Sequence, residues 1–192
     1  KKNPQLPAKQ GITSTDKFTN IPNSINRVVF LGGEPLMTNR HRKFLESLDS
    51  LESLTVEYFT NGMHKLQDTD IDLLSKCKQV HFTVSIDAVG TLNDKVRSGS
   101  VWSKVLDTLN QIAGKFDYTI HTTVHKNNWH GLSDMHDFVK AYKKWTINVL
   151  TFPRGMDIVN LDQTDKSKFL DMLEKFDIPN SHYIKSHLEG VL

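Results

Sequence analysis

Five short runs of apolar and β-branched residues alternate with helical patterns along this chain, and this alternation constrains the fold most strongly. The runs are rich in Val, Ile, Phe, Tyr or Thr and bounded by turn residues, which predicts strands at 27–31, 54–59, 79–86, 118–124 and 146–152. Apolar stripes at helical spacing predict helices near 44–51, 70–76, 102–112, 135–142 and 169–176. Since parallel strands need crossover connections, this order predicts a parallel sheet with helices outside it.

The spacing of the strands limits the architecture further. It is nearly even apart from one wider step, where we expect a long loop over 88–101. Five strand–helix units are too few for a closed eight-stranded barrel, so an α/β fold with an open partial barrel or a doubly wound sheet is expected. Thr38, Ser100 and Ser133 are the expected helix N-caps.

The two ends of the chain differ in composition from its middle. Residues 1–24 are rich in Lys, Pro, Asn, Thr and Gln without an apolar period, which predicts a linker or a loosely attached arm. We expect the core over 25–178 and a C-terminal segment, 179–192, that continues beyond the chain. The chain begins with Lys1 rather than Met and stops at LEGVL, so we expect that it was cut from a longer protein.

Composition excludes several classes of protein. The net charge is only +2 and no block of like charges occurs, so neither nucleic acid nor a membrane surface is an expected partner. No apolar stretch approaches the ~18 residues of a membrane span, and no signal peptide is visible, so we expect a cytoplasmic protein. Cys77 is the single cysteine, which excludes an internal disulfide and an all-cysteine metal site.

Polar segments that contain glycine or asparagine follow each predicted strand. Parallel α/β folds bind ligands at the carboxyl ends of their strands, so these segments should share one rim. They read GGEP, TNG, SIDAVG, HKNN and PRG, at 32–35, 60–62, 85–90, 125–128 and 153–155. Each alone is also what a tight turn requires. Together they predict a ligand site.

Glu34 is the least turn-like residue of this rim. The two glycines before it allow the backbone to approach a ligand closely, and Pro35 cannot donate a hydrogen bond. A carboxylate beside free carbonyl groups would suit the ammonium group of a ligand. The alternative is a salt bridge between Glu34 and a lysine or arginine of a neighbouring loop.

The nine histidines do not predict a metal site. His121 and His125 share a predicted strand face, but four residues in an extended chain span about 13 Å. His182 and His187 lie near the C-terminus without a compact carboxylate partner. We therefore expect core, surface or substrate-facing histidines. The chain also contains no P-loop and no Gly-x-Ser-x-Gly motif, and the acid of GGEP would repel a phosphate.

Three motifs carry a resemblance to a known family. VVFLGGEPL, YFTNG and VSIDAVG followed by VRSGSVW occur in this order at strand–helix spacing. Over about residues 26–153 they resemble the radical S-adenosylmethionine (SAM) enzymes, most closely the sulfatase-maturating-type and twitch- or SPASM-type members, which are often phage-borne. The resemblance implies a partial (β/α)6 TIM-like barrel whose second to sixth strands are the five predicted here.

The resemblance also implies a SAM site. In this family the GGEP element holds the amino group of SAM, which here implies Gly32, Gly33, Glu34 and Pro35. Contacts to the ribose and methionine portions are implied for Thr60, Asn61, Ser85 and Asp87.

Three further contacts to SAM are implied. Arg97 would meet the carboxylate of SAM as a bidentate pair, the alternative being an exposed surface arginine. Asn127 would add a polar contact. The end of the fifth strand, near Phe152 and Pro153, would form an apolar wall against adenine.

One defining element of the family is missing. Its [4Fe–4S] cluster is held by a Cys-x3-Cys-x2-Cys loop after the first barrel strand, and Cys77 cannot replace that loop. We expect the cluster ligands in a missing N-terminal segment. A degenerate protein that has lost its cluster is the alternative.

The resemblance implies an enzyme when the protein is full length. It would cleave SAM reductively to methionine and a 5′-deoxyadenosyl radical, which abstracts hydrogen from a peptide, protein side chain, sugar or nucleotide. Flavodoxin or ferredoxin would supply the electron, and this chain alone should be inactive. Two other classes stay open. One is a cluster-less module that binds a nucleotide-like ligand or a partner. The other is an ordinary α/β enzyme that uses Glu34 and Asp87 as acid and base.

Overall fold

The computed structural model describes residues 25–142 and 144–190, and its centre is one sheet of five strands. All neighbouring strands are parallel, and they lie in chain order from β1 to β5. The strands are β1 (Arg27–Phe30), β2 (Thr55–Thr60), β3 (Gln79–Ser85), β4 (Asp117–Val124) and β5 (Trp145–Val149). The predicted α/β fold with a parallel sheet is confirmed. The sheet stays open, because β1 and β5 are not paired with each other.

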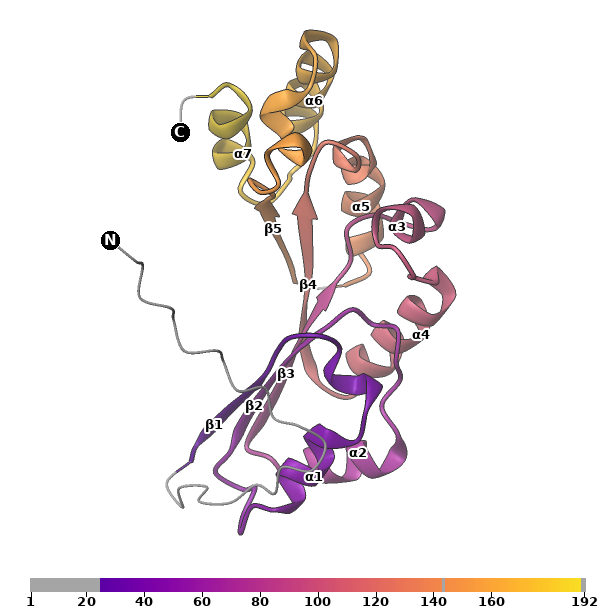
Figure 1. The fold of residues 1–192 in the computed structure, drawn as a ribbon, viewed down its shortest axis with the longest axis vertical. Coiled ribbons are helices and arrows are strands. Elements are labelled where there is room, and N and C mark those ends of the chain that lie inside the picture. The colour runs from indigo at the N-terminus through magenta and orange to yellow at the C-terminus, as the bar shows by residue number, and fades with distance from the viewer. Residues whose placement is uncertain (1–24, 143, 191–192) are drawn as a thin grey trace, which may run out of the picture.

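Five helices cover one side of the sheet (Figure 1). They are α1 (Arg40–Glu46), α2 (Asp68–Leu74), α3 (Thr91–Val96), α4 (Trp102–Ala113) and α5 (Leu132–Val139). Two more, α6 (Gln163–Lys175) and α7 (Ser181–Leu188), lie beyond the carboxyl end of β5 (Figure 1). Short 3-10 turns complete the order: η1 (Pro35–Met37), η2 (Trp129–Gly131), η3 (Arg154–Met156) and η4 (Ile158–Asn160).

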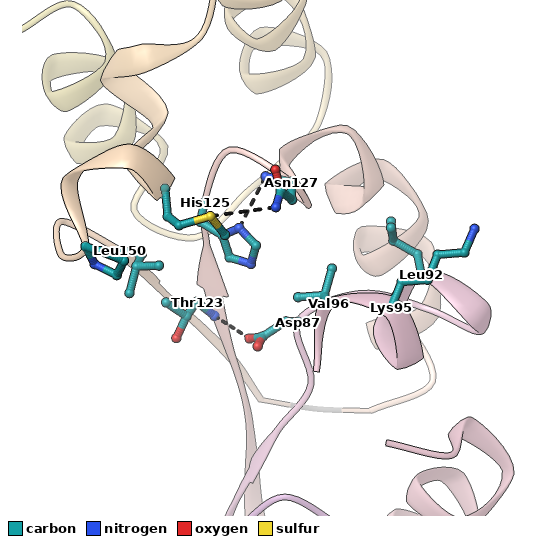
Figure 2. A pocket seen from close by; sticks show the side chains of 10 residues that line it. Asp87, Leu92, Lys95, Val96, Thr123, His125, Asn127 and Leu150 are labelled. Atoms are coloured by element: carbon teal, nitrogen blue, oxygen red, sulfur yellow. Dashed lines mark hydrogen bonds between the residues drawn. The ribbon is translucent and has the colours of Figure 1, made fainter. Parts of the chain in front are cut away.

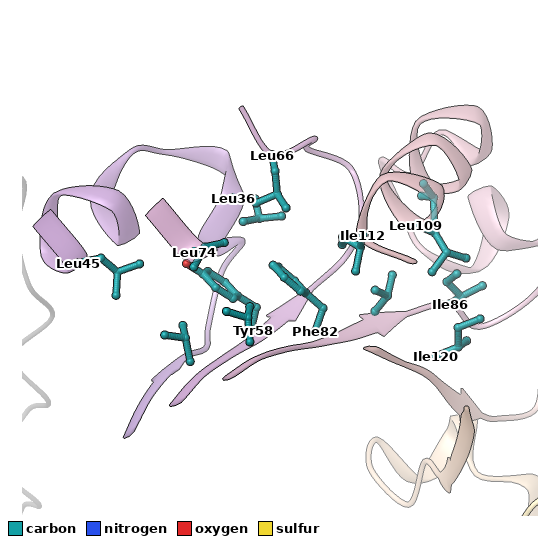
Figure 3. Packing of buried hydrophobic residues seen from close by; sticks show 14 of the residues in the cluster. Leu36, Leu45, Tyr58, Leu66, Leu74, Phe82, Ile86, Leu109, Ile112 and Ile120 are labelled. Carbon is teal, nitrogen blue, oxygen red and sulfur yellow. The ribbon is translucent and has the colours of Figure 1, made fainter. Parts of the chain in front are cut away.

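The main core lies between the sheet and these helices. Every second residue of β2 and β3 points into it, as the two-residue period of a strand requires. The rings of Tyr58 and Phe82 are fully buried and stack with centroids 4.8 Å apart (Figure 3). Leu45 of α1 and Ile112 of α4 pack in the same cluster, so that helices distant in sequence share one apolar layer.

A second, smaller core joins α6 and α7 to the far end of the sheet. Phe169 of α6 lies against Trp129, with ring centroids 5.3 Å apart. Ile184 and Leu188 of α7 are buried in the same cluster, together with Ile147 of β5. The expected limits of the core, 25–178, and of the C-terminal segment, 179–192, stay predictions. The arm predicted over 1–24 lies outside the described residues.

On the opposite side of the sheet lies the face that helices α1–α5 do not cover, which we call the open face, and its β3–β5 half is polar. Its residues there alternate with the buried ones: His81, Thr83 and Ser85 on β3, Thr119, His121 and Thr123 on β4, and Thr146 and Asn148 on β5. All of them are exposed or half-buried. Parallel sheets are normally covered on both faces and apolar on both, so this polar face marks a surface with another role.

The prediction of a long loop over 88–101 is wrong in part, because the helix α3 lies within this segment. This helix has six residues, which is too short for an apolar period to be visible in the sequence. Ser100 is not the N-cap of α4, since that position belongs to Val101. The Ser100 hydroxyl instead accepts a hydrogen bond of 3.0 Å from the Asn93 side chain of α3. Ser100 therefore ties the start of α4 to α3 and does not cap α4.

The other two N-cap predictions are also wrong. Asn39 takes the N-cap position of α1 that was predicted for Thr38. Ser133 lies inside α5, because the η2 turn runs directly into this helix and Gly131 precedes it. The helix near 169–176 begins earlier than predicted, since the Asp162 side chain caps it by accepting a hydrogen bond of 2.8 Å from the Asp165 amide.

Replacing a buried ring of the main core should destabilise the fold strongly. Phe82→Ala is expected to lower the free energy of unfolding by about 3–5 kcal/mol, because it removes apolar contacts and leaves a cavity. Phe59→Ala is the matched control, since Phe59 lies on the open face and is 43% exposed. Its cost should be about 0.5 kcal/mol or less. Urea denaturation of both variants measures the difference, and equal losses would contradict this account of the two faces.

Candidate functional site at the carboxyl ends of the strands

The five polar segments predicted from the sequence lie at one edge of the sheet, because all five strands run in the same direction. We call these segments, 32–35, 60–62, 85–90, 125–128 and 153–155, the rim. Three pockets open along the rim or flank it, with volumes of about 500, 350 and 630 Å³. Small-molecule sites occupy roughly 300–1,000 Å³, so each pocket could hold part of a ligand.

The glycines of the GGEP segment follow β1 and adopt backbone angles that other residues avoid. Gly32 has φ +79° and Gly33 has φ +56°, both in the left-handed region. A Cβ atom at either position would meet nothing within 4 Å. The constraint is therefore conformational rather than steric, and the space beside this backbone is open. Both glycines and Glu34 line the 500 Å³ pocket.

The Glu34 carboxylate connects the ends of β1 and β2. Its Oε1 accepts hydrogen bonds from the Thr60 hydroxyl at 2.7 Å and the Leu36 amide at 3.0 Å. Its Oε2 accepts one from the Asn61 amide at 2.7 Å. The observed partners are thus two backbone amides and a hydroxyl. A carboxylate offers about four acceptor positions, so one remains on Oε2 for a ligand.

Thr60 and Asn61, both predicted to contact a ligand, differ in access. Thr60 is only 2% exposed, and its hydroxyl donates to Glu34 and accepts from the Gly62 amide at 3.1 Å. The Thr60 hydroxyl therefore holds the Glu34 carboxylate in place. Asn61 is half-buried and lines the 350 Å³ pocket. Its side-chain oxygen accepts a hydrogen bond of 2.9 Å from the Met63 amide, which holds the turn after β2.

Asp87 makes four hydrogen bonds on the rim. Its Oδ2 accepts from the Arg97 guanidinium at 2.7 Å, and its Oδ1 from the Thr123 amide of β4 at 2.8 Å. Its own amide donates to Asn93 of α3 at 3.1 Å, and its carbonyl accepts from the Asn128 side chain at 2.8 Å. Asp87 therefore joins the ends of β3 and β4 to α3, and it is only 7% exposed.

Arg97 is not a solvated surface arginine, which was the alternative to its predicted role. Its side chain is 28% exposed and paired with Asp87 through Nη1. It lines the 350 Å³ pocket together with Asn61, Asp87 and the segment 98–100. A guanidinium carries five N–H donors in a planar fork, so donors remain for a ligand in this pocket.

The 630 Å³ pocket lies between the ends of β3, β4 and β5 (Figure 2). Asp87, Thr123, His125 and Asn127 contribute polar groups to it. Its remaining lining is mostly apolar: Leu92, Val96, Leu150, Pro153 and Met156, with Lys95 as a further charged group. Because Asp87 also lines the 350 Å³ pocket, the two pockets adjoin at this carboxylate.

His125 is a pocket residue that the sequence did not identify as a ligand contact. Its Nδ1 accepts a hydrogen bond of 3.2 Å from the Asn127 amide, so in the neutral ring Nε2 carries the proton. Burial lowers the pKa of His125, although Asp87 acts in the opposite direction. The ring is therefore a neutral donor. In the sequence, the signal that could have identified His125 was its position in the HKNN segment, directly after a predicted strand.

Ser85 and Phe152 are placed outside these three pockets. Ser85 lies on the open face, in register with His121 of β4. Phe152 is 80% exposed and is not part of β5, which ends at Val149. Only Pro153 of the predicted apolar wall lines the 630 Å³ pocket.

The described residues do not form a site for an iron–sulfur cluster. Within 25–142 and 144–190, no group of three or more His, Cys, Asp or Glu side chains could hold a metal ion. Cys77 is half-buried against the main core, and burial raises the pKa of its thiol, whereas a cluster needs thiolates. No helix in the described part of the chain is long and apolar enough to cross a membrane.

Comparison with known proteins identifies the fold and the family model that the chain fits. The model described as the radical SAM superfamily matches residues 15–139. Native anSMEcpe with bound AdoMet and Cp18Cys peptide is similar in structure, with TM-score 0.55 and 16% identity over 78% of this chain and 46% of that chain.

Other structures of the same protein give a consistent result. Native anSMEcpe with bound AdoMet has TM-score 0.55 and 18% identity over 85% of this chain and 48% of that chain. A histidine-tagged form of anSMEcpe with bound AdoMet has TM-score 0.56 and 16% identity, covering 85% and 45%. This chain thus spans less than half the length of each of these three structures. No curated protein sequence matches it.

Acid should destabilise the folded chain in the range where histidines titrate. Burial lowers the pKa of His41, His121 and His125 below the ordinary 6.5. As pH falls below 6.5, the unfolded chain therefore takes up protons that the folded chain does not, and stability is lost. Urea denaturation at pH 7.5 and pH 5.5 should show a lower free energy of unfolding at pH 5.5.

The His125→Gln variant tests the source of this loss. It removes one of the three titrating groups and keeps a polar side chain, so its stability should depend less on pH than that of the wild type. A wild-type stability that is constant from pH 7.5 to 5.5 would contradict the assignment.

Proposed function

Because the chain belongs to the radical SAM superfamily, we propose that its rim binds S-adenosylmethionine. The observation that carries the proposal is the position of Asp87. This residue lines both the 350 and the 630 Å³ pocket, so one elongated ligand could extend across them. SAM has two unlike ends, a charged methionine portion and a largely flat adenine, and the two pockets differ in the same way.

The polar pocket suits the methionine portion. Glu34 and the two glycines line the neighbouring 500 Å³ pocket instead, and the acceptor position left on Glu34 Oε2 would receive the ammonium group there. The remaining donors of Arg97 would pair with the carboxylate of the ligand. Asn61 lies in the same pocket and adds an amide group.

The larger pocket suits the adenosine portion. Val96, Leu150 and Met156 give it apolar sides against which a purine could pack. Asn127 and the Nε2–H group of His125 offer hydrogen bonds to ring nitrogens or ribose hydroxyls. His125 thereby joins the set of proposed contacts.

The cluster that the family uses does not fit the residues of this chain. One protonated cysteine cannot supply three thiolates, so any [4Fe–4S] cluster of the intact protein would need ligands from outside this sequence. We propose that this chain contributes the SAM-binding part of a radical SAM enzyme. Its substrate, its electron donor and its place among the twitch-, SPASM- or phage-type members stay predictions.

The same residues also bear on the two other classes of function predicted from the sequence. A cluster-less SAM-binding module is favoured by the single cysteine and is the second candidate. An ordinary α/β enzyme with Glu34 and Asp87 as acid and base is less well supported. Glu34 accepts hydrogen bonds from three donors and Asp87 from a guanidinium and an amide, so both carboxylates have structural partners within the chain.

Arg97→Ala should weaken SAM binding measurably. Loss of a charge-assisted hydrogen bond is worth about 1.5–3 kcal/mol, which corresponds to a roughly 10- to 100-fold higher Kd by calorimetric titration. Arg27→Ala is the matched control, because Arg27 also pairs with a carboxylate, that of Glu57, but at the first residue of β1. Its Kd should equal that of the wild type. Equal affinity in Arg97→Ala and the wild type would refute the contact.

The chain should bind SAM without cleaving it. Incubated anaerobically with SAM and dithionite, the 192 residues should yield no 5′-deoxyadenosine, since they lack the thiolates of a cluster. The full-length protein, after anaerobic reconstitution with iron and sulfide, should produce it. A full-length protein that binds SAM but takes up no cluster would establish the second candidate. Absence of SAM binding would refute both.

A further inference from the structure

The open face carries a row of polar side chains next to the proposed SAM site. Ser85 of β3, His121 of β4 and Thr146 of β5 are in register, so they form one line across three strands. Asp87 follows Ser85 by two residues, just beyond the end of β3, and its charge acts on the His121 ring. The row therefore adjoins the carboxylate that lines both rim pockets.

The hydrogen bonds of His121 define which ring nitrogen is available. Its Nδ1 lies 3.0 Å from the Thr146 hydroxyl oxygen. Assigning the hydroxyl proton to the Ile120 carbonyl oxygen, 3.5 Å away, makes the hydroxyl an acceptor from the ring and places the ring proton on Nδ1. The lone pair of the ring is then on Nε2. Among the described residues, this nitrogen has no hydrogen-bond partner.

The charge state of His121 agrees with this geometry. Burial lowers its pKa, and Arg97 acts in the same direction, whereas Asp87 raises it. Asp87 and Arg97 are the charged groups that act on the ring, and they are paired with each other at 2.7 Å. The imidazole is consequently neutral near pH 7, with an acceptor aimed away from its threonine partner.

His81 shows by contrast what a structural histidine on this face looks like. It lies on β3, and its Nδ1 bonds the Asp117 carboxylate at 2.8 Å. Its Nε2 bonds the Thr119 hydroxyl at 3.2 Å. Both ring nitrogens are occupied, so His81 serves the fold. His121 has one nitrogen occupied and one available.

We propose that His121 is a substrate-positioning residue, whose Nε2 accepts a hydrogen bond from a neutral O–H or N–H group of the substrate. This inference rests on the proposed function, because it places the substrate beside the SAM site. Ser85 is the register partner of His121 on the neighbouring strand β3. A lone pair on Nε2 disfavours an anionic group there, so the group recognised is a hydroxyl or an amide.

The tautomer of His121 is tested first, by nitrogen NMR of the ¹⁵N-histidine-labelled chain at pH 7.5 without SAM. The expected spectrum shows His121 neutral and protonated on Nδ1. Thr146→Val removes the acceptor and should shift the His121 tautomer, while Thr119→Val should change His81 alone. A His121 protonated on Nε2 in the wild type, or a response of His121 to Thr119→Val alone, would overturn the proposal.

Binding of a donor group is tested next, with SAM at saturation. N-acetylalaninamide represents amide donors and methyl glucoside represents hydroxyl donors. Either should shift the Nε2 signal of His121 saturably, and which one does so distinguishes a peptide-like from a sugar-like substrate. Acetate has no donor and is the control. No shift with either probe, or equal shifts with acetate, would overturn the proposal.

A conservative variant separates positioning from a merely structural role. His121→Gln keeps an acceptor and should bind the effective probe within about tenfold of the wild type. His121→Phe should abolish binding while SAM affinity stays unchanged. A wild-type chain that does not bind SAM would instead count against the proposed function. The tautomer of His121 is measured without SAM, so that result does not depend on the proposed function.

Discussion

The buried carboxylate of Asp87 is the interaction on which the rest of the site depends. A charged group that is only 7% exposed must be paired and hydrogen-bonded, because burying it without partners is costly. Arg97 supplies the opposite charge and the Thr123 amide a second donor. Through these bonds one side chain holds together the ends of β3 and β4 and the segment after α3, and so it shapes two adjoining pockets.

The two faces of the sheet have different physical roles. The face under α1–α5 is apolar, and its stacked rings and aliphatic side chains provide most of the driving force for folding. The open face keeps hydroxyl and imidazole groups in register on β3–β5. Some of these groups bond one another, as Thr119 does His81 and Thr146 does His121, while His121 Nε2 is left for the polar molecule proposed above.

The sequence was sufficient for the parallel direction of the strands and for the rim, since these follow from the strand–helix alternation. The alternation left the order of strands in the sheet open between a partial barrel and a doubly wound sheet. It also selected Glu34, Asp87 and Arg97. It did not reveal that Glu34 bonds Thr60 or that Asp87 pairs with Arg97, because such partners depend on three-dimensional placement. The short helix α3 was missed because six residues cannot display a helical period.

The central claim, that the rim of this parallel sheet is a SAM site, is tested most directly by hydrogen–deuterium exchange of the chain with and without SAM. The account predicts slower exchange in the segments 32–36, 60–63, 87–100 and 125–128, which come from four different strand ends. Exchange in α6 and α7, none of whose residues lines the three rim pockets, should not change. Protection confined to α6 and α7, or no protection at saturating SAM, would contradict the account.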